Sequence, residues 1–125
     1  MTSPQPRRPT SDPAAPPAAE DVEWAEELAR SWVEVYKKSA TTLALLRILR
    51  DEGPLAAAGI APRFTETTGW TLTERGLYRT LRRLAEAGVL STRRVDVART
   101  GAKRQDFALS PVGRLYLERL EDELV

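Results

Sequence analysis

The stretch from Thr71 to Gly88, TLTERGLYRTLRRLAEAG, has the pattern of a helix with two chemically different faces. At about 100° per residue, three leucines fall on one narrow stripe: Leu77, Leu81 and Leu84. Three arginines fall on the opposite side: Arg75, Arg79 and Arg82. Such a helix is either a solvated surface helix or a helix that enters the major groove of DNA. The stretch alone leaves both alternatives open.

The ends of this helix are also marked in the sequence. Thr73 is a good N-cap, and Thr71 with Glu74 forms a second candidate, a capping box. Gly88 suits the left-handed residue that follows a helix end. We therefore predict a helix over residues 73–87.

Composition excludes several classes of protein. With 125 residues, no cysteine and no histidine, the chain is expected to form one domain with a modest core, no metal site and no cofactor. We expect no enzyme, because the acids of residues 20–27 and 118–123 look like solvated helix faces rather than a general acid–base pair. No apolar run spans a membrane or resembles a signal peptide, so a cytoplasmic protein is the expectation.

Charge is distributed unevenly along the chain, although the net charge is only +1. Residues 71–104 carry nine Arg or Lys against three acids, whereas residues 20–38 and 105–125 are each acidic, at −3. One basic surface on a near-neutral protein suits a nucleic-acid binder. The same arginines could also serve only to solubilise the surface.

The N-terminal part divides into a tail and a helix. Residues 1–19 contain six of the nine prolines and are predicted to be a disordered Pro/Ala-rich tail. Residues 20–38 form a predicted helix with a broad aromatic face, which includes Trp24, Leu28, Trp32 and Tyr36. This face either folds back on the domain or contacts the same helix of another subunit. We favour the contact between subunits, which predicts a homodimer.

Two further helices precede the stretch from Thr71. Residues 39–51 form a strongly apolar helix that Ser39 or Thr41 would cap and that Glu52-Gly53-Pro54 would end. Residues 55–68 form a weaker helix, predicted to be kinked or broken near Pro62, with Ile60 and Phe64 turned inward.

After Gly88 the pattern changes to that of strands. Residues 89–97 and 103–109 flank a glycine-containing turn at 98–102, which predicts a β-hairpin within residues 90–109. Ser110-Pro111 then marks the start of a last helix over 111–125. One side of that helix carries three leucines that are candidates for a dimer contact: Leu117, Leu120 and Leu124.

Helices followed by a basic hairpin predict a mainly α fold with a small β-hairpin. This is a winged helix-turn-helix domain over residues 20–125, with an extra N-terminal helix, a core and wing at 39–110, and a C-terminal helix. In this layout the third core helix enters the major groove and the hairpin is the wing.

Three segments resemble the PadR-like transcriptional regulators: KKSATTLALLRILRDEGPL, GLYRTLRRLAEAGVLSTRR and RQDFALSPVGRLYLERL. The shared features are the Glu-Gly-Pro-Leu turn, the Leu-Tyr step at 77–78, and the Leu-Ser step at 109–110 followed by Gly113. Ala56 to Gly59 replace a usual His-Gly-Tyr, and Glu74 departs from the pattern as well. The resemblance implies a winged-helix, dimeric, repressor-type regulator whose partner is double-stranded DNA. It names neither the operator nor a small-molecule effector, although an effector is a possible partner.

The candidate DNA-binding residues fall into two groups. On the helix they are Thr73, Arg75, Tyr78, Arg79 and Arg82, of which the arginines can contact guanine edges or phosphates. On the wing, cations would hold the phosphate backbone: Arg99, Lys103 and Arg104. Arg93 and Arg94 point to opposite sides of a strand, so at most one is expected to face DNA. The alternative function is a winged-helix adaptor that binds a protein partner and has no preferred operator.

Overall fold

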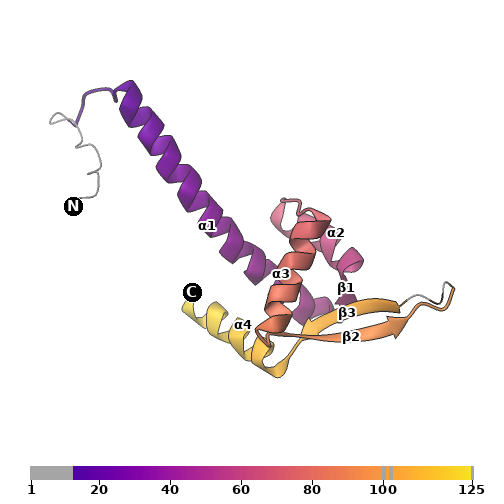
Figure 1. Cartoon of the computed structure of the whole chain (residues 1–125). Coiled ribbons are helices and arrows are strands. Elements are labelled where there is room, and N and C mark those ends of the chain that lie inside the picture. The colour runs from indigo at the N-terminus through magenta and orange to yellow at the C-terminus, as the bar shows by residue number, and fades with distance from the viewer. Residues whose placement is uncertain (1–12, 100, 102, 125) are drawn as a thin grey trace, which may run out of the picture. The chain divides into compact units, whose positions relative to one another are not determined.

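The computed structural model describes residues 13–99, 101 and 103–124 (Figure 1). It contains α1 (Ala19–Glu52), β1 (Leu55–Ala56), α2 (Ala57–Thr68), α3 (Glu74–Glu86), β2 (Leu90–Asp96), β3 (Lys103–Leu109) and α4 (Pro111–Glu123). The chain divides between Lys38 and Ser39 into two compact units. A mainly helical chain with a small antiparallel sheet confirms the predicted winged-helix fold class.

Helix α1 is one element where the sequence predicted two. The expected start of a second helix at Ser39 is wrong, because α1 continues from Ala19 to Glu52. No glycine or proline interrupts this range, and serine or threonine inside a helix costs less than about 1 kcal/mol relative to alanine. The predicted stop is confirmed, since the Gly53 N–H donates to the Leu49 carbonyl at 3.0 Å just beyond the helix end. Of the predicted tail, residues 1–12 lie outside the described residues.

The hydrophobic core lies in the second unit and draws on every helix there. The largest fully buried side chains are Leu45, Leu46, Ile60, Phe64, Leu81 and Leu117. Ile60 and Phe64 face inward as predicted. The break predicted near Pro62 is wrong, because α2 runs from Ala57 to Thr68 with Pro62 inside it. Burial of the two flanking side chains offsets the backbone hydrogen bond that proline cannot make.

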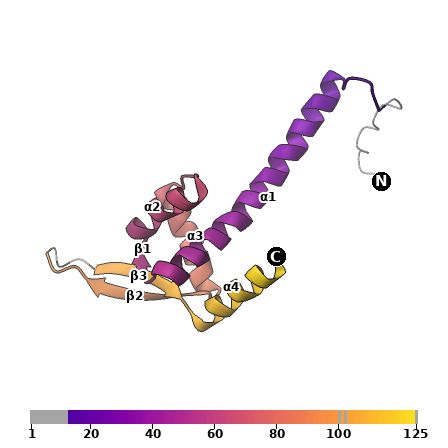
Figure 2. The ribbon, with the colours of Figure 1, turned by 180° about the vertical axis from the view of Figure 1, so that it is seen from behind.

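The sheet has three strands in the order β1-β3-β2, all antiparallel. The β2–β3 hairpin confirms the predicted one, and in Figures 1 and 2 its two strands extend past the helices of the core. Strand β1 was not predicted, and residues 55–56 were assigned to a helix instead. Two residues are too few to show an alternating pattern, and only their pairing with Phe107 and Asp106 makes them a strand.

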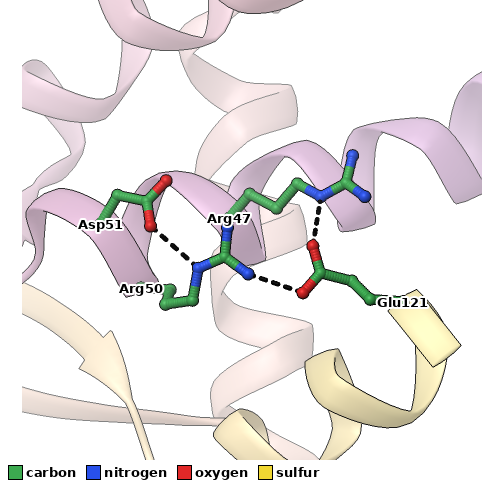
Figure 3. A network of polar contacts seen from close by, with 4 residues as sticks. All are labelled: Arg47, Arg50, Asp51 and Glu121. Atoms are coloured by element: carbon green, nitrogen blue, oxygen red, sulfur yellow. Dashed lines mark hydrogen bonds and ion pairs between the residues drawn. The ribbon is translucent and has the colours of Figure 1, made fainter.

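Helix α4 is fixed to the core at both ends. At its start, the Ser110 hydroxyl accepts a hydrogen bond from the Gly113 N–H at 2.9 Å, which confirms the predicted cap. Near its end, the Glu121 carboxylate accepts from Arg47 Nε at 2.9 Å and Arg50 Nη1 at 2.6 Å (Figure 3). Arg50 also donates to Asp51 at 2.8 Å. These contacts hold α4 against the last turns of α1.

Candidate nucleic-acid interface

Helix α3 is held at both ends by its own backbone chemistry. At the start, Thr73 Oγ1 accepts from the Gly76 N–H at 3.0 Å, so Thr73 is the N-cap and the alternative box from Thr71 is not formed. At the end, Gly88 has φ +80°, and the Val89 N–H donates to the Leu84 carbonyl at 2.9 Å. This is the Schellman arrangement, in which a left-handed residue closes the helix. The boundaries predicted for the helix are confirmed to within a residue.

The two faces of α3 separate as the sequence predicted. Leu77, Leu81 and Leu84 are all buried in the core. Arg75, Arg79 and Arg82 are exposed, and within the described residues no ion pair ties them to a carboxylate. Desolvation of three arginines would be costly, so a helix with this pattern must keep that face toward water or an anionic partner. The buried leucines therefore fix which side of α3 is presented outward.

Tyr78 lies at the junction of two shallow clefts beside α3, and its side chain is 42% exposed. A cleft of about 360 Å³ lies between α2 and α3, and Glu74 lines it together with Tyr78 and Leu72. Glu74 also sits in the first turn of α3, where a negative charge stabilises the N-terminal end of the helix. Glu74 therefore has a structural role at the start of α3.

The second cleft, of about 270 Å³, lies between α3 and the wing. Tyr78, Arg82, Ala85 and Glu86 line it from α3, and Thr92, Gln105 and Phe107 line it from the sheet. Arg82 of the arginine face and one face of the hairpin therefore line the same cleft. The helix and the wing, which the sequence predicted separately, border the same cleft.

The strand register decides which wing residues share that surface. Thr92 pairs with Phe107 and Arg94 pairs with Gln105, so Arg94 lies on the sheet face that lines the cleft. Arg93 pairs with Asp106 on the opposite face. The sequence did not name Arg94 as a DNA-binding candidate, because residue types alone do not settle which of the two arginines faces the helix. The register of the hairpin supplies this distinction.

The predicted wing cations are in different environments. Arg104 lies on the face opposite the cleft, and its Nε donates to the buried Asp106 carboxylate at 2.9 Å. Lys103 is on the cleft face and lies 3.9 Å from the Asp96 carboxylate at the open end of the hairpin. Arg99 is exposed near the turn, of which Thr100 and Ala102 lie outside the described residues. The structure thus separates Arg104 from the other candidates and gives it a partner within its own strand.

The candidate dimer residues also divide. On α1, Trp24, Leu28, Trp32 and Tyr36 are all exposed, between 40% and 66%. On α4, Leu117 is only 1% exposed and Leu120 packs against the core, so these two side chains belong to the core of their own chain. Leu124 is exposed, and so are three apolar side chains of α4 that are not among the candidate dimer residues: Val112, Leu115 and Tyr116.

Among the described residues we find neither a metal-binding cluster nor a membrane-spanning helix. They include no cluster of three or more His, Cys, Asp or Glu side chains arranged to hold a metal ion. They also include no helix that is both long enough and apolar enough to cross a membrane.

No protein-family model and no curated protein matches the sequence. Solved structures do match the fold. A PadR-like transcription factor from Bacteroides fragilis aligns with a TM-score of 0.65 at 23% identity, over 75% of this chain and 88% of its own. A PadR family transcriptional regulator from Eggerthella lenta aligns with a TM-score of 0.61 at 16% identity, over 82% of this chain and 87% of its own.

This chain has the PadR-like winged-helix fold. The resemblance that the three sequence segments indicated is therefore confirmed at the level of the fold. Bacillus subtilis PadR, solved in complex with operator DNA, aligns with a TM-score of 0.56 at 25% identity. That match covers 63% of this chain and 46% of the longer PadR chain.

Proposed function

We propose that this PadR-like chain is a sequence-specific DNA-binding regulator that acts as a homodimeric repressor. Helix α3 enters the major groove, and the β2–β3 hairpin contacts the neighbouring backbone. The observation that carries the proposal is the cleft that Arg82 of α3 and Gln105 of the wing line together, beside the exposed Arg75 and Arg79. Arg94 lies on the same face of the sheet as Gln105. The DNA complex of the structurally similar B. subtilis PadR supports DNA as the partner class.

The contacts follow from the chemistry of the side chains. Arg75, Arg79 and Arg82 have guanidinium groups that can donate two hydrogen bonds to a guanine edge, a contact worth about 1–3 kcal/mol of discrimination. Arg94, Lys103 and Arg99 supply the charge that contacts phosphates and gives the binding its salt dependence. Tyr78, half exposed beside Arg82, can donate its hydroxyl to a phosphate. Thr73 Oγ1 already accepts a hydrogen bond as the N-cap of α3, so the main role of this side chain is to fix the start of the helix.

A two-fold symmetric homodimer would bind an operator with matching two-fold symmetry. Two α3 helices related by a two-fold axis would recognise half-sites in inverted orientation. Occupancy of such a site at a promoter would exclude other proteins from it, which is the repressor mode that we propose.

Selection of DNA from a random pool by the purified full-length chain tests this function. We expect enrichment of an inverted repeat, with an affinity that falls steeply as salt rises from 50 to 200 mM, as expected of several phosphate contacts (about 10³-fold for six). A winged-helix adaptor would enrich no sequence at all, and that result would refute the proposal.

A further inference from the structure

The first part of α1, residues 20–38, has apolar side chains on one half of its circumference and most of its charges on the other. At about 100° per residue, the large apolar side chains share one side: Val22, Trp24, Leu28, Trp32, Val35 and Tyr36. All six are exposed, and the rings of Trp32 and Tyr36 stack at 5.4 Å with an angle of 8° between their planes. An exposed apolar surface of this extent marks a protein contact.

The charges of the same segment are polarised along its length. Residues 20–29 carry five acids and no base, whereas residues 30–38 carry three bases and one acid. The N-terminal part of the segment is therefore negative and its C-terminal part is positive. Charges that flank an apolar helix face decide the orientation in which two helices pair.

We propose that residues 20–38 pair in an antiparallel orientation with the same segment of a second copy of this chain. A parallel pair would place the five acids of one copy beside the same five acids of the other. An antiparallel pair places the acidic part of each helix beside the basic part of its counterpart. The segment is thus complementary to itself in one orientation only.

The sequence fits an antiparallel pair centred midway between Leu28 and Trp32, so that Leu28 of one copy is level with Trp32 of the other. Ala25 is then level with Val35, and residues of the two apolar faces meet.

Two charged residues lie on one flank of the apolar face. Glu20 of one copy and Lys38 of the other are within one turn of each other there, and equivalent flanks meet in a two-fold antiparallel pair.

This inference rests on the homodimer of the proposed function and specifies its partner surface, but it is independent of the DNA contacts of α3 and the wing. The chain has no cysteine, so single cysteines can report the orientation. Full-length Ala25→Cys and Val35→Cys variants are oxidised separately and as a mixture, without DNA. Disulfides need Cα atoms about 4.4–6.8 Å apart, which makes the readout specific.

We expect the wild-type chain to sediment as a dimer and a disulfide to form in the mixture, between one variant and the other. Cross-linking of the Ala25→Cys variant with itself would show a parallel pair and overturn the proposal. A monomer in sedimentation, or a dimer that cross-links in neither experiment, would overturn it too. The Arg79→Ala plus Arg82→Ala variant should still dimerise, so failure of this proposal and failure of DNA recognition give different results.

Charge reversal provides a second test that leaves the apolar face unchanged. Glu20→Lys or Lys38→Glu alone should raise the dissociation constant of the dimer severalfold, and the two together should restore it. Glu23→Lys makes the same charge change on the side of the helix opposite the apolar face and is the matched control. An equal effect of Glu23→Lys, or no restoration by the double reversal, would contradict the antiparallel pair.

Discussion

Arg82 of α3 and Gln105 of β3 line the same cleft, although they lie in different elements. This relationship joins the arginine face of the helix to one face of the wing. Since Gln105 pairs with Arg94, that arginine lies on the same face of the sheet. An anionic polymer that contacts α3 would therefore also meet the wing.

The two neighbouring arginines of β2 should behave differently. Arg94→Ala removes a cation from the cleft face, so we expect weaker binding to all DNA sequences and a salt slope reduced by about one unit. Arg93→Ala makes the same change on the opposite face and should leave the affinity nearly unchanged. Titrations at several salt concentrations measure both. Equal losses in the two variants would contradict the assignment of the sheet faces.

The Thr73 cap should matter for stability. Thr73→Ala leaves the Gly76 N–H without its side-chain acceptor, so the free energy of unfolding should fall by about 1 kcal/mol. Thr73→Ser keeps the hydroxyl and should lose much less. Urea unfolding followed by circular dichroism measures the difference. If the alanine variant were as stable as the serine variant, the cap would not hold the helix start.

Glu121 should make the stability of the core sensitive to acid. The hydrogen bond from Arg47, with further contributions from Arg50, lowers the pKa of Glu121 below its ordinary value of 4.5. Arg50 likewise lowers the pKa of Asp51 below its ordinary value of 3.8. A lowered pKa means that the unfolded chain binds more protons in this range, so stability is present above the ordinary values and is lost as the pH falls through the lowered ones.

Glu121→Gln should therefore flatten the decline of unfolding free energy below about pH 4.5, where the free carboxyl group of the unfolded chain takes up its proton. It should also lower stability at neutral pH. Glu123→Gln, an exposed position at the end of the same helix, is the control. Unfolding curves between pH 3 and pH 7 give the comparison. An unchanged pH dependence in Glu121→Gln would exclude this carboxylate as a source of the acid sensitivity.

Local patterns in the sequence were enough to place α3 and the hairpin. The leucine spacing at 77, 81 and 84 and the glycine at 88 are short-range signals, and the structure confirms both. The continuity of α1 was missed because Ser39 has the chemistry of a cap, and a residue type cannot show whether a helix begins there. Strand β1 was missed because a two-residue strand exists only through its partner β3.

The arrangement of the candidate interface depended on pairing between distant residues. Arg104 has the residue type of a phosphate contact, yet its guanidinium group binds Asp106 on the far face of the sheet. The leucines of α4 have the spacing of a dimer seam, yet Leu117 is buried within its own subunit. Periodicity identifies an apolar face but not the surface that covers it. The strand register is needed to place Arg104, and the burial of the side chain is needed to place Leu117.

The central claim is that the exposed arginines of α3 recognise an operator. Its most direct test is the affinity of the Arg79→Ala plus Arg82→Ala variant for the selected operator, with Arg93→Ala plus Arg119→Ala as a control of equal charge. Both variants should remain folded, because all four side chains are exposed. We predict that the first variant binds the operator no better than unrelated DNA while the control retains its preference. Operator affinity unchanged in the first variant would contradict the account.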